Sequence, residues 1–322
     1  MKSARRFACF IPLLLWLLLL PGCAGNSGVA QYKVYFVAKS LDTEFWQAAF
    51  AGANAAAAEY NIDLTILGPE TEEDFETQNM YIAQAVEAGA GALVFSAISY
   101  EENAGAVDAA AAKGVRIVVI DSDVASGSVS ARIGTDNVEA GRMAAAAALD
   151  TDWEALVVGI VNYDLGSRNG QERESGLREA LRADPRVQDI YTINVLASPE
   201  AARAGGKQLL SEHPEINVLI GLNEPLAVGA AQAVEDLELA SRVRMVGFDT
   251  NVRCIDLMRD GSVSALIVQN PYAMGYLGVE SAWELIEGRT YDPEALIDTA
   301  TTIVTRDNMF TQESQKALFP FG

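Results

Sequence analysis

Nine side chains with binding chemistry stand at or near the ends of short apolar runs in this 322-residue chain. They supply two cations, two carboxylates, two amides, a hydroxyl and two adjacent rings: Lys39, Phe45, Trp46, Ser96, Asp121, Arg173, Asn223, Asp249 and Gln269. Planar carboxylate, amide and guanidinium groups can each engage two vicinal hydroxyls, and hydrogen bonds to charged groups contribute about 1.5–3 kcal/mol each. Aromatic rings pack against apolar C–H faces. The set therefore predicts a binding site for a monosaccharide or polyol.

The acids and the rings of this set also have structural explanations. Asp121 and Asp249 could cap the helices that follow them or close turns. Phe45 and Trp46 could be core residues of the first helix, although two adjacent rings cannot face the same interior, which favours at least one in a cleft. The sequence leaves these interpretations open.

The cations and amides have alternatives as well. Arg173 lies in the charged helical segment "QERESGLREAL" and could form a surface salt bridge. Lys39 could be an exposed lysine at a strand end. Asn223 and Gln269 follow buried strands, where an amide must find partners, so they could brace the backbone instead of a ligand.

The elements that must position these residues alternate regularly between strand and helix from Tyr32 onward. Nearly all-apolar runs, typical of parallel strands covered on both faces, occupy 34–37, 64–67, 92–95, 117–120, 156–161, 190–195, 218–220, 245–248 and 266–268. Alanine-rich helical segments lie between them, and Gly114 ends one of these helices. The pattern predicts an α/β fold with doubly wound parallel sheets.

One part of the chain repeats another. Residues 91–123 and 217–250 both contain a strand that ends in a polar residue, a helix, and a second strand that ends in an acid, Asp121 or Asp249. Two similar α/β units predict two lobes that face each other. Because ligands bind at the carboxyl ends of parallel strands, the strand-end residues of both lobes should converge on one cleft.

Catalysis and several partner classes are disfavoured. The sequence has no GxSxG, HExxH or GxxxxGK[ST] motif, and its one histidine, His213, precedes Pro214 at a predicted helix end. Asp121 and Asp249 could form a glycosidase acid/base pair, but nothing around them supports one. A formal net charge of −21 argues against nucleic acid and anionic membrane surfaces. We expect no enzyme activity and no metal or cofactor. We also expect the protein to be a monomer.

The first residues form a targeting segment. Basic residues, an apolar run and then "LPGC" predict a lipoprotein signal peptide over 1–22, with Cys23 acylated and 23–31 as a tether. The apolar run is short for a membrane span, which needs about 20 residues. We therefore expect an extracytoplasmic, lipid-anchored protein. Cys254 is then a lone thiol, predicted to be buried on a helix, and the cysteines give no metal or redox site.

The chain from Tyr32 to about Thr305 resembles the ribose-binding-protein-like periplasmic sugar-binding proteins of ABC transporters, which share a core with LacI-type repressors. The resemblance rests on the order and spacing of "KSLDTEFWQAAFAGA", "VVIDSD", "IGTDNVEAGRMAA", "NEPLAVGAAQA", "MVGFDT" and "VQNPYAMGYLGVE". It implies ring contacts to a sugar from Phe45 and Trp46. It also implies hydrogen bonds to hydroxyls from Asp121, Arg173, Asn223, Asp249 and Gln269, with Ser96 where ribose binders carry an asparagine.

Three departures from the family pattern bear on the ligand. Lys39 replaces a small hydroxyl residue, Ser122 replaces an arginine, and Ala197 falls where ribose binders place a ring. The lysine and "DSD" are similar to those of family members that bind the furanone autoinducer. These members use an acid at a place that falls near residues 162–164 here, and Asp164 could serve. A sensor module that docks on a chemoreceptor or sensor kinase is therefore the alternative to a sugar or polyol importer component.

The resemblance also implies how the lobes are built. Residues 32–134 and 270–298 would form the N-terminal lobe, and residues 135–269 and 299–322 the C-terminal lobe. The three crossovers, near Thr135, Gln269–Asn270 and Asp298–Thr299, would form a three-segment hinge of the type I periplasmic-binding-protein fold. Closure about this hinge would bury the ligand and present a closed surface to an ABC transporter permease.

Overall fold

The computed structural model describes residues 31–163 and 165–319, and its folded elements lie in a compact unit that begins at Tyr32. The predicted signal peptide, Cys23, all but the last residue of the tether, and Asp164 lie outside the described residues. Within the described ranges, every helix is too short or too polar to cross a membrane.

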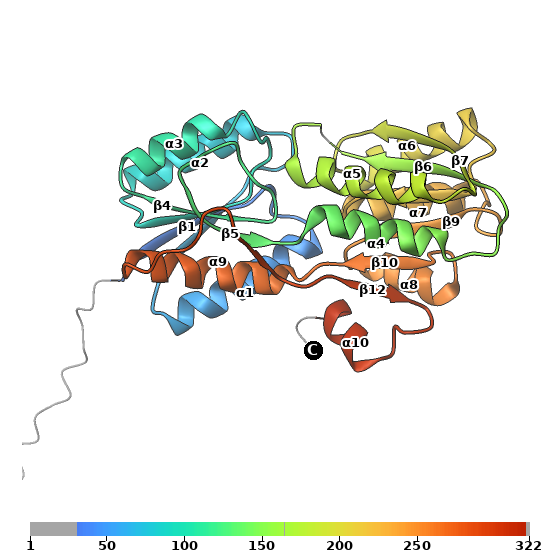
Figure 1. Ribbon diagram of the computed structural model, residues 1–322. Coiled ribbons are helices and arrows are strands. Elements are labelled where there is room, and N and C mark those ends of the chain that lie inside the picture. The colour runs from blue at the N-terminus through green and yellow to red at the C-terminus, as the bar shows by residue number, and fades with distance from the viewer. Residues whose placement is uncertain (1–30, 164, 320–322) are drawn as a thin grey trace, which may run out of the picture. The chain divides into compact units, whose positions relative to one another are not determined.

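The described strands form two six-stranded sheets (Figure 1). The first sheet has the order β11-β5-β4-β3-β1-β2, and all of its strand pairs are parallel. Its strands are β1 (Lys33–Val37), β2 (Asp63–Leu67), β3 (Ala92–Phe95), β4 (Arg116–Ile120), β5 (Val129–Gly134) and β11 (Leu296–Asp298).

The second sheet has the order β12-β10-β9-β8-β6-β7. Its strands are β6 (Leu156–Asn162), β7 (Val187–Asn194), β8 (Val218–Gly221), β9 (Arg244–Phe248), β10 (Ala265–Val268) and β12 (Thr302–Thr305). The edge strand β12 runs antiparallel to β10, whereas the other strand pairs of this sheet are parallel, as predicted for both lobes. A short connection links β11 of the first sheet to β12, and β12 then runs beside β10 in the opposite direction.

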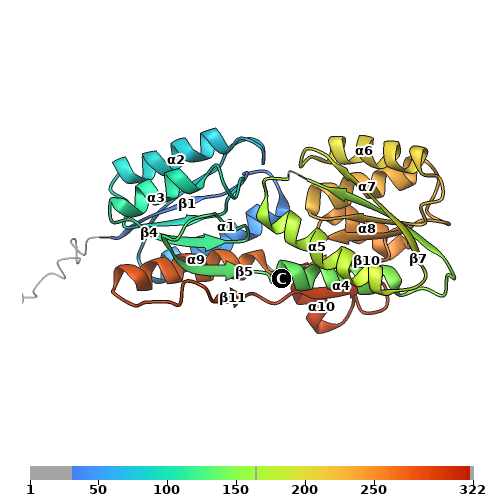
Figure 2. The ribbon, with the colours of Figure 1, turned by 45° about the horizontal axis from the view of Figure 1, so that its top comes forward.

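The first lobe, as we use the term, is the first sheet with the helices packed on it, α1 (Glu44–Glu59), α2 (Phe75–Glu87), α3 (Ala104–Ala112) and α9 (Pro271–Ile286). Successive residues of β1 point to opposite faces of the sheet. Val34 and Phe36 join the cluster under α1 and α9, whereas Tyr35 and Val37 join the cluster under α2 and α3. Figure 2 shows these helix pairs on opposite faces of the sheet. Both faces are buried, which explains the unbroken apolar runs.

The second lobe is the second sheet with α4 (Asn137–Leu149), α5 (Arg168–Ala183), α6 (Pro199–Glu212), α7 (Glu224–Asp236), α8 (Val252–Asp260) and α10 (Gln312–Leu318). Helices α4 and α5 pack against each other very closely at glycines. A Cβ atom on Gly141 of α4 would lie 2.1 Å from the carbonyl oxygen of Arg173 on α5. The position of Arg173 therefore depends on the lack of a side chain at Gly141.

All nine strands expected from the sequence are present, and three strands were missed: β5, β11 and β12. In β5 the residues alternate between buried and half-buried, and the two others are short edge strands with few apolar residues. The prediction that Gly114 ends a helix is confirmed by its φ of +90° just after α3. His213 follows the last residue of α6 and Cys254 is buried on α8, also as predicted.

Two of the predicted crossovers contact each other. The backbone N–H and the hydroxyl of Thr299 donate to the carbonyl oxygen of Gly134, at 2.9 and 3.1 Å. Strands that precede Gly134 lie in the first sheet, and strands from Leu156 to Val268 lie in the second. The exact lobe boundaries at 134/135, 269/270 and 298/299 stay a prediction.

Candidate functional site

A cavity with about 300 Å³ of unfilled space, open solvent included, lies between the carboxyl ends of the strands of both sheets. All nine residues predicted to bind the ligand line it except Ser96. The lining also contains residues that were not predicted: Thr43, Glu72, Tyr163, Asn169, Glu224 and Pro225.

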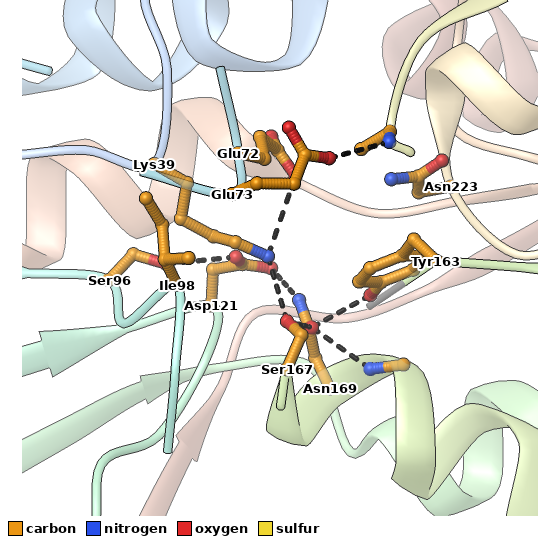
Figure 3. Close-up of polar contacts among 12 residues, drawn as sticks. Lys39, Glu72, Glu73, Ser96, Ile98, Asp121, Tyr163, Ser167, Asn169 and Asn223 are labelled. Atoms are coloured by element: carbon orange, nitrogen blue, oxygen red, sulfur yellow. Dashed lines mark hydrogen bonds and ion pairs between the residues drawn. The ribbon is translucent and has the colours of Figure 1, made fainter. Parts of the chain in front are cut away.

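In the first lobe, Asp121 directly follows β4 and has a φ of 57°, in the left-handed region that a non-glycine residue rarely adopts. Its carboxylate accepts a hydrogen bond from the Ser96 hydroxyl at 2.9 Å. It also accepts one from the Asn169 amide of the second lobe, at 3.0 Å (Figure 3). Ser96 therefore lies behind Asp121 and orients it. Neither aspartate caps the helix that follows it. Asp121 is followed by the strand β5, and the helix after Asp249, α8, is capped by Asn251.

In the second lobe, Asp249 directly follows β9 and has a φ of 64°. It accepts hydrogen bonds from the Gln269 amide at 2.7 Å and from the backbone N–H of Glu224 at 3.1 Å. Burial raises the pKa of Asp249 to about 6, although nearby Arg173 and the Gln269 hydrogen bond act in the opposite direction. A hydrogen bond donated by a ligand hydroxyl would stabilise the charged form of this buried carboxylate.

Arg173 is buried and forms no surface salt bridge, so that alternative is wrong. Its guanidinium donates to the Gln269 side chain at 2.8 Å, to the Asn137 side chain at 2.9 Å and to the Leu222 carbonyl at 2.9 Å. The guanidinium also lies 4.8 Å from the centroid of the Phe248 ring. Gln269 therefore links Arg173 to Asp249, and the three side chains form one network.

Lys39 is 2% exposed, so the alternative of an exposed lysine is also wrong. Its Nζ crosses to the second lobe and donates to the Ser167 hydroxyl at 2.9 Å. It also lies 3.5 Å from a Glu72 carboxylate oxygen and 5.1 Å from the centroid of the Tyr163 ring (Figure 3). Lys39 thus has a hydrogen bond, an ion pair and a cation–π contact in a buried position.

Phe45 and Trp46 belong to the core under α1 and also line the cavity, so the two interpretations of these rings are compatible. Their centroids lie 5.1 Å apart in an edge-to-face arrangement. The Trp46 ring stacks on Phe50 at 6.2 Å, and its Nε1–H donates to Glu72 at 3.0 Å. These contacts fix both rings before any ligand arrives.

Glu224 joins the second lobe to the amino end of α1 in the first. Its carboxylate accepts hydrogen bonds from the backbone N–H groups of Glu44 at 3.3 Å and Phe45 at 2.9 Å. An anion at a helix amino terminus is stabilised by the free N–H groups there. Burial still dominates and raises the pKa of Glu224 to about 7.

The residues missed by sequence reasoning had weak signals. Glu72 lies in the loop after β2, a strand end for which no candidate was chosen. Glu224 follows Asn223, whose side chain caps α7 by accepting from the N–H of Leu226 at 3.1 Å. Tyr163 directly follows β6, and Asn169 lies in the first turn of α5. An examination of the residues after every predicted strand, including those outside the repeated units, would have found Glu72 and Tyr163.

Residues 34–290 match the family described as periplasmic binding protein domain. The chain belongs to the periplasmic binding protein family. Membership implies a location outside the cytoplasm. The predictions of a type I periplasmic-binding-protein fold and of a binding protein that is not an enzyme are confirmed by this match and by the similar structures.

This periplasmic binding protein is similar in sequence or structure to several characterised proteins, of which three follow. It is 26% identical to the ribose import binding protein of Haemophilus influenzae over 292 residues, which cover 87% of this chain and 94% of that one. It superimposes with a TM-score of 0.86 and 26% identity on a carbohydrate transporter solute binding protein of Agrobacterium radiobacter in complex with D-arabinose, over 90% of this chain and all of that one. A second structure, from the XylFII–LytSN complex, has a TM-score of 0.78 and 27% identity over 86% of this chain and 99% of that one.

Proposed function

We propose that this protein is a lipid-anchored solute-binding protein that captures a monosaccharide or polyol between its lobes and delivers it to an ABC importer permease. The observation that carries the proposal is the cavity itself. It lies between two lobes, and it combines two strand-end aspartates with an arginine, three amides and two fixed rings. The names of the relatives, one a ribose import binding protein and one crystallised with D-arabinose, support a sugar as ligand.

The proposed contacts are the residues predicted from the sequence that line the cavity, with Ser96 behind Asp121. Phe45 and Trp46 form the ring platform, and the polar contacts are Lys39, Asp121, Arg173, Asn223, Asp249 and Gln269. Closure about the three crossovers would bring the two walls together. Hydrogen bonds between the lobes, such as Lys39 to Ser167 and Phe45 to Glu224, would form in the closed state. A ligand favours that state only through its higher affinity for it.

Anchoring and delivery rest on the amino-terminal segment and the family. Acylation at Cys23 would hold the protein at the outer face of the cell membrane, and residues 24–31 would leave the lobes free to reach a permease. The alternative is a sensor module for a sugar or the furanone autoinducer that docks on a chemoreceptor or sensor kinase. One similar structure is of the XylFII–LytSN complex, so a relative of this chain has been solved with a bound partner.

A thermal-shift screen tests the ligand class. The full-length chain in detergent would be heated with pentoses, hexoses, inositols, linear polyols, nucleosides and the furanone autoinducer. A compound at 100 times its dissociation constant adds about 2.7 kcal/mol, a shift of a few degrees. A selective shift with one sugar or polyol supports the proposal. A shift with the furanone alone favours the sensor, and a flat panel contradicts both.

A further inference from the structure

The charges around the cavity are unequal. Among the described residues that line it, two are cations and four are acids: Lys39 and Arg173 against Glu72, Asp121, Glu224 and Asp249. A buried lysine in a binding cleft would ordinarily indicate an anionic ligand, such as a sugar acid or a sugar phosphate. Whether it does so here depends on whether the charge of either cation is available.

The charge of Lys39 is already matched. Glu72 lies 3.5 Å from its Nζ, and Ser167 and the Tyr163 ring occupy two further directions around the ammonium group. Glu72 is itself held in place, because its other oxygen accepts from Trp46 Nε1 at 3.0 Å. The pair is therefore built into the wall as a unit with no net charge.

The charge of Arg173 is also matched. Its guanidinium donates to three neutral acceptors of its own lobe, on Asn137, Leu222 and Gln269. Asp121 lies 3.9 Å away across the cavity, and the buried Asp249 is linked to it through Gln269. After these pairings, the excess charge that faces the cavity is acidic.

A second cavity adjoins the first and shares Thr43, Glu72, Glu224 and Pro225 with it. Its described lining contains five acids and no lysine or arginine: Asp42, Glu70, Glu72, Glu73 and Glu224. Glu73 spans the lobes there, because its carboxylate accepts from the backbone N–H of Ala197 at 2.8 Å (Figure 3). A ligand that passes this region meets a field of one sign, which favours neutral and cationic molecules and repels anions.

We propose that the site selects uncharged or positively charged saccharides and rejects sugar acids and sugar phosphates, with the Lys39–Glu72 pair as the determinant of this selection. The inference rests on the proposed function and narrows its ligand class. Lys39 serves as a neutralised contact that joins the two lobes through Ser167, and not as a receptor for an anion.

Isothermal titration of the full-length chain with matched series tests this selection. The probes are D-glucose, D-glucuronate and D-glucosamine, the corresponding galactose series, and D-ribose with D-ribose 5-phosphate. We expect each anionic member to bind at least 100-fold more weakly than its neutral counterpart in the series that binds. An anionic member that binds as tightly as its neutral counterpart overturns the inference and leaves the proposed function standing. A flat thermal-shift panel overturns the proposed function and the inference together. If that panel identifies a sugar outside these series, that sugar and its own acid or phosphate form the matched pair for the titration.

A pair of charge-matched variants locates the determinant. Glu72→Gln leaves Lys39 unopposed, so the affinity of the acid relative to the neutral sugar should rise at least tenfold. Glu76→Gln removes the same charge from an exposed position in the first turn of α2 and should change that ratio less than twofold. Equal ratios in Glu72→Gln and the wild type contradict the proposed role of the pair.

The reverse variant protects the test against a folding defect in Glu72→Gln. Lys39→Met leaves the Glu72 carboxylate unopposed, and the affinity of D-glucosamine relative to D-glucose should then rise at least tenfold. A merely structural role for Lys39 would weaken all members of a series by a similar factor. An unchanged ratio in this variant therefore also contradicts the inference.

Discussion

The two strand-end aspartates occupy equivalent places in the two lobes but are connected differently. Asp121 and Asp249 each follow a buried strand with a positive φ, 57° and 64°. Each has a supporting side chain in its own lobe, Ser96 for one and Gln269 for the other. Only Asp121 accepts directly from the opposite lobe, through the neutral amide of Asn169.

On the Asp249 side, the contact between the lobes is made by Glu224, whose backbone is hydrogen-bonded to Asp249. Glu224 donates its N–H to Asp249 and sends its carboxylate to the amino end of α1. One connection between the lobes is thus made by an amide and the other by an ionisable acid. The two acids therefore have the same backbone position in the two lobes. The residues next to them differ, so one side of the cleft has a neutral contact between the lobes and the other has an ionisable one.

The largest expected effect is a pH dependence of stability on the Glu224 side. Its pKa is raised from 4.5 to about 7, so its contribution to folding is full below about pH 4.5 and is lost as the pH rises towards 7. At about 1.4 kcal/mol per pKa unit, the loss is on the order of 3 kcal/mol. Denaturant unfolding of the wild type and Glu224→Gln at pH 5 and pH 7.5 measures it.

The raised pKa of Asp249 acts in the same direction, so the comparison must use the difference between wild type and variant. The wild type should lose more stability than Glu224→Gln between the two pH values. If both lose the same amount, Glu224 does not titrate in this range and the two sides of the cleft are electrostatically alike.

Removal of the carboxylate on the same side should have the next largest effect, on ligand affinity. Asp249→Ala deletes a charged acceptor, which costs about 1.5–3 kcal/mol, or about 10- to 150-fold in the dissociation constant. Titration of the sugar identified by the thermal-shift screen measures this change. A change of less than twofold would show that Asp249 does not contact the ligand.

A third prediction concerns the helix that holds Arg173 beside Asp249. Gly141→Ala would place a Cβ 2.1 Å from the Arg173 carbonyl oxygen and force α4 and α5 apart, at a cost of about 1–3 kcal/mol. Thermal unfolding measures the loss. Gly105→Ala is the matched control, because a Cβ there meets nothing within 4 Å and a helical alanine should stabilise by about 0.5–1 kcal/mol. Equal effects of the two substitutions would contradict the close approach.

The smallest effect is expected on the Asp121 side. Ser96→Ala removes one hydroxyl that orients Asp121, at a cost of about 0.5–1.5 kcal/mol in ligand affinity. The same titration measures it. A loss above 100-fold would mean that Ser96 contacts the ligand itself, as the sequence analysis predicted.

Much of the fold followed from local sequence, because strands buried on both faces must be apolar along their whole length. This pattern located β1 to β4 and β6 to β10. The strands β5, β11 and β12 lie at or near sheet edges, where one side of each strand has fewer neighbours and the residues can be polar. Their existence depends on strands already placed by distant parts of the chain, so local pattern could not indicate them.

The sequence by itself determined that acids and amides would follow buried strands and that the carboxyl ends of those strands would share one edge. It could not determine the partners of Lys39, since Glu72 and Ser167 lie 33 and 128 residues away along the chain. A lysine at a strand end has the same local sequence whether it faces solvent, an anionic ligand or a carboxylate. Only the tertiary structure decided among these, because the charge that a ligand meets is the sum over all elements that surround the cavity.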